Sequence, residues 1–298
     1  MTLAALARSE QKRTMIHALA AAATLLGASP VDAEFDRQRA DWNRPVAPFR
    51  IAGNVYYVGT AGVSAFLVTT PRGHILIDGG FEETAPRIAT SIETLGFKLR
   101  DVRHLLINHA HWDHAGGLAD LKRRTGATLW ASVADRATLE AGRSFHRDDL
   151  APFAPVKVDR VIGEGGVVAI GGVRVTARLT PGHTQGCTSF TTQVADRAIR
   201  GGRSLDVAFA CSLSVAGQQL VNNTRYPTVA RDYDASFAKL RRMKADIYLT
   251  FHPDLFGLTP KRARGTADAF VDRGELRRRV DAARAAYLTE LARQRATR

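Results

Sequence analysis

The sequence predicts a layered α/β fold in a single domain. Apolar runs with strand-like composition alternate with segments of helical period in two similar rounds, and no linker-like stretch separates the rounds. The composition, with 45% apolar and 24% charged residues, is that of a globular protein. Disorder is therefore excluded for most of the 298-residue chain, and its length is sufficient for a full core.

The first round is predicted to open with strands rich in Val, Ile, Tyr and Phe. Strands are expected at Ile51–Val58, Ala65–Thr70, His74–Ile77, Val102–Ile107 and Leu129–Ala131. Helices are expected at Pro86–Leu95, which Gly96 ends, and at Leu118–Arg124 after a Gly-Gly turn. Residues 141–155 contain Gly, Ser, Asp and two prolines, which predict a loop.

The second round repeats the alternation. Strands are expected at Val156–Ile162, Val167–Ile170, Val173–Leu179, Thr188–Val194, Leu205–Ala210 and Ile247–Thr250. A helix is predicted over Asp234–Met243. A C-terminal helix aligns Leu276, Val280, Ala283, Tyr287 and Leu291 on one stripe. Its run Arg277-Arg278-Arg279 is interpreted as a solvated face, so no nucleic-acid partner is expected.

The N-terminus has the pattern of an export signal. Arg8, Lys12 and Arg13 precede an uncharged Ala/Leu-rich stretch, and Val31-Asp32-Ala33 has the form of a cleavage site. We expect residues 1–33 to be a cleaved signal peptide and residues 34–298 to form the single mature domain, in the periplasm. The formal charge of +13 then becomes about +12. No other segment is long and apolar enough for stable membrane insertion, and no oligomerisation signal is present, so a monomer is expected.

One segment concentrates residues that can bind metal. Asn108-His109-Ala110-His111-Trp112-Asp113-His114 follows an apolar strand and precedes Gly116-Gly117. Residues two apart in extended backbone point the same way, so His109 and His111 can bind one ion. Asp113 and His114 follow as the chain turns, and they can face a second ion. Imidazole and carboxylate groups suit Zn²⁺, and two adjacent cations can share one hydroxide.

Two more ligands are expected from strand ends elsewhere. His183 follows the strand Val173–Leu179, and His252 follows Ile247–Thr250. The other histidines, His17, His74, His104 and His146, are interpreted as solvated or structural. With only two cysteines, the chain has neither a disulfide scaffold nor a Cys-rich zinc ribbon.

With these motifs the sequence resembles the metallo-β-lactamase superfamily, and in particular the third subclass of class B β-lactamases. The resemblance covers almost all of the mature chain. It is carried by Trp42 with Pro45–Phe49, Val58-Gly59-Thr60, Leu76–Gly80, His109–Gly117, Thr180–Cys187, Cys211–Ser214, Asn222–Pro227 and His252-Pro253.

The resemblance implies a four-layer αβ/βα sandwich with two Zn²⁺ ions at one edge. The first zinc would be bound by His109, His111 and His183, and the second by Asp113, His114 and His252. Ser212 stands where other subclasses use a cysteine ligand, and Ser212 and Ser214 would help to bind the substrate carboxylate. A metal-bridging hydroxide would hydrolyse the amide bond of penicillins, cephalosporins and carbapenems, giving antibiotic resistance, with Asp113 as the catalytic residue that orients it.

Two positions leave alternatives open. Some members of the subclass carry a tyrosine as a proposed oxyanion donor where this chain has Gln218 after Gly217. Cys187 and Cys211 should flank the metal site, and in an exported protein a disulfide between them is favoured. The alternatives are two buried free thiols or Cys211 as a zinc ligand.

Two other functions compete with β-lactam hydrolysis. Lactonases and thioesterases of the superfamily normally bridge the metals with an aspartate from the strand that leads to Ser212. Here that stretch is Ala208-Phe209-Ala210-Cys211-Ser212, and Asp206 lies too early. A non-catalytic zinc-binding protein with an anionic partner would suit the positive charge, but structural zinc sites are closed rather than open. A Ser-His-Asp hydrolase is excluded, since no Gly-x-Ser-x-Gly motif occurs.

Overall fold

A computed structural model describes residues 30–297. The chain divides into two compact units, the first ending at Trp42 and the second comprising Asn43–Arg298. In the first unit the described part is helix α2 (Pro30–Trp42). Residues 1–29 of the expected signal peptide lie outside the described residues, and the expected cleavage site after Ala33 falls within α2.

The second unit contains two sheets. The first sheet has seven strands in chain order: β1 (Phe49–Ala52), β2 (Val55–Tyr57), β3 (Phe66–Val68), β4 (His74–Ile77), β5 (Val102–Leu106), β6 (Thr128–Ala131) and β7 (Arg160–Val161). The second sheet, in the order β12-β11-β10-β9-β8, has five: β8 (Val167–Ile170), β9 (Val173–Leu179), β10 (Thr188–Ala195), β11 (Ser204–Ala210) and β12 (Ile247–Thr250). β4–β7 run parallel, as do β11 and β12, and the other neighbours are antiparallel.

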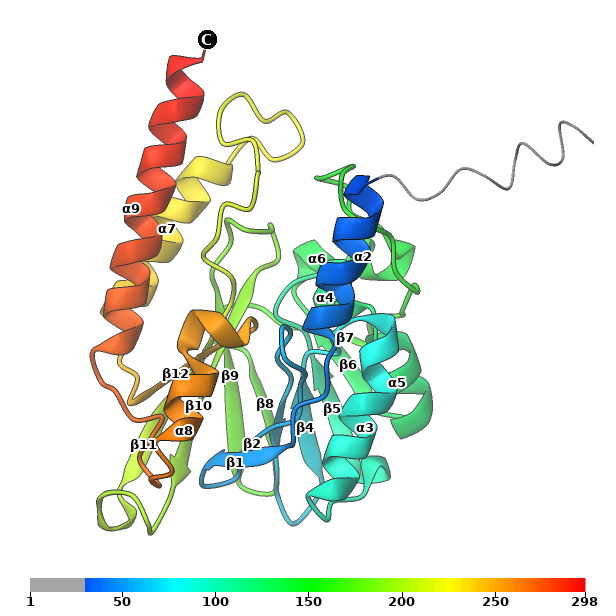
Figure 1. The fold of residues 1–298 in the computed structure, drawn as a ribbon, viewed down its shortest axis with the longest axis vertical. Coiled ribbons are helices and arrows are strands. Elements are labelled where there is room, and N and C mark those ends of the chain that lie inside the picture. The colour runs from blue at the N-terminus through cyan, green and yellow to red at the C-terminus, as the bar shows by residue number, and fades with distance from the viewer. Residues whose placement is uncertain (1–29, 298) are drawn as a thin grey trace, which may run out of the picture. The chain divides into compact units, whose positions relative to one another are not determined.

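Helices cover the outer faces of both sheets (Figure 1). On one side are α3 (Ala85–Thr94), α4 (Trp112–Ala115), α5 (Leu118–Thr125) and α6 (Val133–Ala141). On the other side are α7 (Val229–Arg242), α8 (Leu258–Ala263) and α9 (Glu275–Ala296). Short 3₁₀ turns occur at Glu82–Thr84, Leu99–Asp101, Arg200–Gly202 and Pro253–Phe256. The result is the expected αβ/βα sandwich.

The sandwich follows from the period of the strands. Along β4, Ile75 and Ile77 enter a core that also contains side chains of the second sheet, whereas Leu76 enters a separate core beneath α3 and α5. Successive side chains of a strand point to opposite faces, so a continuous apolar run is buried on both sides. Along β5, Leu106 likewise enters the core between the sheets, and Leu105 enters the core beneath α3 and α5.

Several predicted elements differ from those observed. The expected strand Ile51–Val58 is two strands, because the chain turns at Gly53-Asn54 with Gly53 at φ +51°. Of Val156–Ile162 only Arg160–Val161 is a strand. Helix α6 lies before the predicted loop 141–155 and was not predicted. Helix α7 begins at Val229, five residues earlier than expected.

Candidate metal centre

The first cluster of potential ligands consists of three histidines from two parts of the chain. His109 and His111 follow β5, and His183 lies on the loop between β9 and β10. One nitrogen of each lies within 4.8 Å of the others, and His183 Nε2 is 3.2 Å from His111 Nδ1. His109 Nε2 is buried and has no hydrogen-bond partner. Three converging imidazole nitrogens with such an orphan atom are typical of a metal site.

The second cluster adjoins the first and consists of Asp113, His114 and His252. Asp113 and His114 lie on the single turn of α4, so the chain already turns at residues 112–115, before Gly116-Gly117. Asp113 Oδ2 is 3.2 Å from His114 Nε2 and 3.6 Å from His252 Nε2. The rings of His109 and His114 are 4.4 Å apart, which brings the two clusters side by side. All six residues that the sequence predicted as ligands are thus together.

The strand ends explain why these segments meet. β5, β11 and β12 all end at one edge of the sandwich, and His109, Cys211 and His252 follow within three residues of these ends. The backbone N–H of Thr188, at the start of β10, donates to the Asn108 carbonyl oxygen at 2.7 Å and joins the two sheets there. Side chains at carboxyl ends of neighbouring strands converge in folds of this kind.

A second layer of oxygens orients the imidazoles. His183 Nδ1 is 2.7 Å from the carbonyl oxygen of Ser214, and His252 Nδ1 is 3.0 Å from the carbonyl oxygen of Gly62. His114 Nδ1 is 3.2 Å from the carboxylate oxygen Oδ2 of Asp78. Nδ1 of His109 contacts Asn108 Oδ1. When Nδ1 of a histidine is bonded to an oxygen, its Nε2 is left as the lone-pair donor toward a metal. His111 instead presents Nδ1 toward the cluster.

Protonation of the site is set by burial and by the two acids. Burial lowers the pKa of His109 and His111 far below the ordinary value and that of His183 to about 4, so these imidazoles are neutral at pH 7. Burial also acts to lower the pKa of His114, but Asp113 and Asp78 outweigh it and raise that pKa to about 10. Burial acts to raise the pKa of Asp113, but the neighbouring imidazole of His114 outweighs this effect and holds that pKa below its ordinary value.

These residues fit divalent zinc. Five imidazoles and one carboxylate are ligands that zinc prefers, and three protein ligands per ion would leave a coordination position for water or substrate. A buried cluster of neutral imidazoles without a cation would leave orphaned nitrogens, as at His109. His114 must lose a proton to bind a metal.

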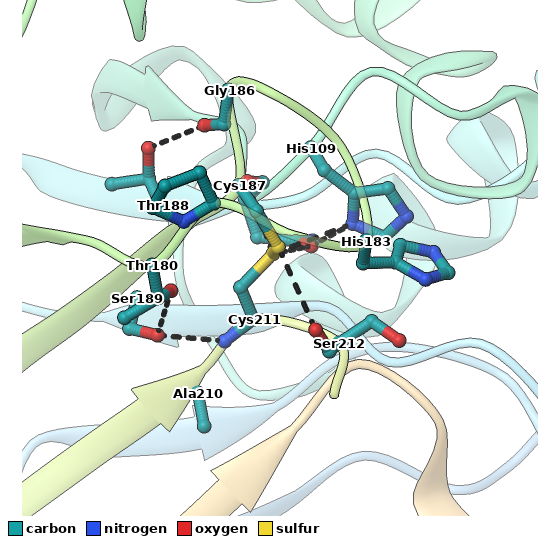
Figure 2. The surroundings of a disulfide bond; sticks show 12 residues. His109, Thr180, His183, Gly186, Cys187, Thr188, Ser189, Ala210, Cys211 and Ser212 are labelled. Carbon is teal, nitrogen blue, oxygen red and sulfur yellow. Dashed lines mark hydrogen bonds between the residues drawn. A yellow bond between two sulfur atoms is a disulfide. The ribbon is translucent and has the colours of Figure 1, made fainter. Parts of the chain in front are cut away.

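Cys187 and Cys211 form a disulfide beside this cluster (Figure 2). Their Cα atoms are 5.8 Å apart, and both residues are fully buried at the ends of the paired strands β10 and β11. Cys211 Sγ is 3.8 Å from His109 Nδ1, so the bridge packs directly behind a predicted metal ligand. With both sulfurs in the bridge, neither free thiols nor Cys211 as a ligand describes this state.

The segment after Cys211 lies next to His183. Ser212 is buried, and its hydroxyl accepts a hydrogen bond from the Ser214 N–H at 3.3 Å. Ser214 is exposed, while its carbonyl oxygen contacts His183. Both serines expected to bind substrate are therefore close to the first cluster. Asp206 is remote, since it precedes Cys211 by five strand residues, or roughly 17 Å, and bonds to Gln193 instead.

Sequence reasoning missed the residues that support the ligands. Asp78 was not among the expected site residues, yet its carboxylate contacts His114 and accepts the Asn108 N–H at 2.9 Å. Its position directly after a buried strand was an available signal. The Tyr233 hydroxyl lies 2.7 Å from the Ser214 carbonyl oxygen, which also contacts His183. Tyr233 gave no signal in the sequence, because its spacing on α7 is that of an ordinary core residue. His74, His104 and His146, the other described histidines, lie outside both clusters.

The family model of the metallo-β-lactamase superfamily matches residues 58–252. The chain belongs to this superfamily. Solved structures of subclass B3 resemble it over nearly their whole length. BJP-1 of Bradyrhizobium japonicum, a subclass B3 metallo-β-lactamase, is 38% identical with a TM-score of 0.81, covering 86% of this chain and 98% of that one. A Cronobacter sakazakii metallo-β-lactamase is 42% identical with a TM-score of 0.81, covering 87% and 99%. The expected family and fold are thereby confirmed.

Matches among curated proteins are partial. The lactamase-like protein vrtG of Penicillium aethiopicum is 27% identical over 204 residues, which cover 68% of this chain and 60% of that protein. A hydroxyacylglutathione hydrolase of Rhodopseudomonas palustris (strain BisB5) is 32% identical over 119 residues, covering 40% and 39%. The chain thus spans less than two thirds of the length of these relatives.

Proposed function

We propose that this chain hydrolyses the β-lactam amide bond with two bound zinc ions, acting on penicillins, cephalosporins and carbapenems and so giving antibiotic resistance. The observation that carries the proposal is the pair of adjoining clusters, His109/His111/His183 and Asp113/His114/His252. The similarity to subclass B3 β-lactamases over nearly their whole length supports the choice of substrate.

The six clustered residues would hold the ions. When bound, zinc would lower the pKa of water to about 7 and polarise the lactam carbonyl. Asp113 is ionised at neutral pH, so its second carboxylate oxygen is available to accept a hydrogen bond from the attacking water and orient it. The hydroxyls of Ser212 and Ser214 would donate to the substrate carboxylate, next to His183.

A second candidate is a thioesterase or lactonase activity, which the hydroxyacylglutathione hydrolase relatives favour. Enzymes of that kind normally have a bridging aspartate before Ser212. Here Ala208-Phe209-Ala210 occupies that stretch, and Asp206 bonds to Gln193 at the far end of β11. The absence of a carboxylate from residues 208–212 supports β-lactam hydrolysis as the first choice.

The test is hydrolysis of a chromogenic cephalosporin by the purified protein, with and without a strong chelator, beside an acylglutathione thioester. The proposal expects cephalosporin turnover that the chelator abolishes and added zinc restores. Asp113→Ala should abolish turnover, whereas Asp120→Asn, which removes an acid on α5, should not. Chelator-resistant turnover would contradict the zinc mechanism. Turnover of the thioester alone would establish the second candidate, and metal binding without any turnover would indicate a binding protein.

We also propose that residues 1–33 direct export to the periplasm and that residues 34–298 act as a monomeric mature domain. No helix among residues 30–297 is long and apolar enough to cross a bilayer. Expression of the full chain, followed by N-terminal sequencing of the periplasmic protein, should give Glu34 as the first residue. Light scattering on the same sample should give a monomer mass, and an unprocessed N-terminus would contradict the proposed signal.

A further inference from the structure

We propose that Tyr233, on helix α7, is a positioning residue for His183. Its hydroxyl fixes the Ser214 carbonyl, and this carbonyl in turn fixes the orientation and the tautomer of the His183 imidazole. The inference deepens the proposed function, because it assumes that His183 is a metal ligand.

The Ser214 carbonyl oxygen is the junction. It lies 2.7 Å from His183 Nδ1 and 2.7 Å from the Tyr233 hydroxyl. A carbonyl oxygen has two lone pairs, so it accepts both bonds at once. Nδ1 of His183 therefore carries the hydrogen, and the lone pair of Nε2 points toward His111, 3.2 Å away.

Tyr233 is itself held by close packing. It is 1% exposed, and its ring stacks on those of Phe237 and Tyr287 with centroids 5.8 and 5.1 Å apart. Burial raises the pKa of Tyr233 well above its ordinary value, so the phenol keeps its proton and can donate to Ser214 at every physiological pH. The donor is thus held in a fixed place and in a fixed protonation state.

The loop that carries His183 lies directly on this ring. Gly182 has φ +147°, and a Cβ atom there would overlap the Tyr233 ring. Ser236, one turn further along α7, donates from its hydroxyl to the Pro181 carbonyl oxygen at 2.6 Å. Helix α7 therefore contacts residues 181 and 182 and, through Ser214, residue 183.

Gln218 supports the same loop from another side. Its buried side-chain amide faces the carbonyl oxygens of Gly182 and His183, so its nitrogen donates to them, at 3.1 and 3.2 Å. The backbone carbonyl oxygen of Gln218 in turn accepts a hydrogen bond from Gln294 Nε2 of α9 at 3.0 Å. The amide is therefore committed to the backbone of the ligand loop, and Gln218 supports that loop instead of acting as an oxyanion donor.

Tyr287 offers a matched control. It is as buried as Tyr233 and stacks on it, but its hydroxyl donates to the Ala230 carbonyl oxygen of α7, at 3.1 Å, instead of to the metal loop. A purely structural role predicts that Tyr233→Phe and Tyr287→Phe behave alike. A positioning role predicts that only Tyr233→Phe alters His183.

The experiment compares both variants with the wild type in two measurements. In the metal-free proteins, ¹⁵N NMR reports whether Nδ1 or Nε2 of His183 carries the hydrogen. Competition with a chromophoric chelator gives the zinc affinity. Tyr233→Phe should mix the tautomers and weaken zinc binding about 10- to 100-fold, the usual effect of losing a partner that orients a ligand. Tyr287→Phe should leave both unchanged.

An unaltered His183 tautomer and zinc affinity in Tyr233→Phe would overturn the proposal, and so would equal losses in both variants. Neither measurement requires turnover. If the wild type binds zinc but does not hydrolyse β-lactams, only the proposed function fails. If it binds no zinc, the tautomer of the metal-free protein still decides the role of Tyr233.

Discussion

His114 Nδ1 lies 3.2 Å from Oδ2 of Asp78, a carboxylate that is completely buried. Asp78 also has φ +68° and accepts the backbone N–H of Asn108 at 2.9 Å. Asp78 is thus a strained and desolvated acid at the end of β4, where it orients His114 and anchors the segment that carries His109, His111 and Asp113. The free energy lost to backbone strain and to burial of the carboxylate would be offset by its support of a metal ligand.

Replacing Asp78 by Asn should therefore weaken metal binding. The amide is isosteric, but it removes the charge that keeps the Nδ1 hydrogen of His114 in place, and we expect zinc affinity to fall about 10- to 100-fold. Competition with a chelator measures this. Asp101→Asn, a change at a partly exposed acid outside the cluster, is the control. Equal affinity of the Asp78 variant and the wild type would contradict a supporting role for Asp78.

The disulfide should contribute substantially to stability. It closes a loop between residues 24 apart in sequence, and chain entropy alone assigns such a bridge about 3 kcal/mol. Cys187→Ser with Cys211→Ser should lower the free energy of unfolding by about that amount, as measured by denaturant titration of the metal-free proteins. A chemical reductant should destabilise the wild type and leave the double variant unaffected. A reductant effect on the variant would point to another cause.

The ion pair of Lys261 and Glu275 is buried, with side chains 8% and 6% exposed, and Lys261 lies near the rings of Phe256 and Phe270. Removing Lys261 leaves the buried Glu275 carboxylate with the longer 3.4 Å contact to Arg279, whose side chain is 41% exposed, so Lys261→Met should cost about 3 kcal/mol. Adding Glu275→Leu should restore most of that loss. The largely exposed pair Arg278–Asp272 is the control. Arg278→Ala should lower the free energy of unfolding by about 1 kcal/mol or less. Lack of recovery in the double variant would contradict this account.

Asp135, near the start of α6, should make stability depend on pH. It packs against Gly186 so closely that a Cβ there would overlap its carboxylate, and burial raises its pKa to about 7. The folded state thus holds a proton that the unfolded chain releases near pH 4, and stability falls as pH rises from about 4 to 7. Asp135→Asn should therefore gain stability relative to the wild type between pH 5 and pH 8.

Denaturant titration at several pH values checks this prediction. Asp159→Asn is the control, since Lys122 overcomes the effect of burial and holds the pKa of Asp159 below its ordinary value. The stability that Asp159 contributes through this pKa shift is present above pH 4 and is lost only in acid. The difference in unfolding free energy between Asp159→Asn and the wild type should therefore be constant from pH 6 to pH 8. A constant difference for Asp135→Asn over pH 5–8 would mean that Asp135 does not titrate there.

The predicted ligands were accessible from sequence because their signals are local. His109 and His111 stand two apart at the end of an apolar run, and His183 and His252 each follow a strand. The supporting residues depend on tertiary packing. Tyr233 has the helical spacing of a core side chain, and only the approach of Gly182 and Ser214 gives its hydroxyl a partner near the site.

The errors in the fold prediction have related causes. Val156 and Val158 are buried beneath the first sheet although their backbone is not in a strand, so an apolar pattern alone did not distinguish packing from pairing. Helix α6 did carry a local signal, because Ser132 caps it by accepting the Asp135 N–H at 3.1 Å. Its apolar period is too short to outweigh the loop residues that follow.

The distribution of the ligands along the chain has a consequence for biosynthesis. Each cluster takes two residues from the segment 109–114 and one from much later, His183 or His252. A nascent chain that has reached β8 contains four of the six predicted ligands but can complete neither cluster. The second cluster is complete only after β12 has been synthesised and has paired with β11. Capture of the two zinc ions proposed above would therefore have to follow synthesis of nearly the whole sandwich.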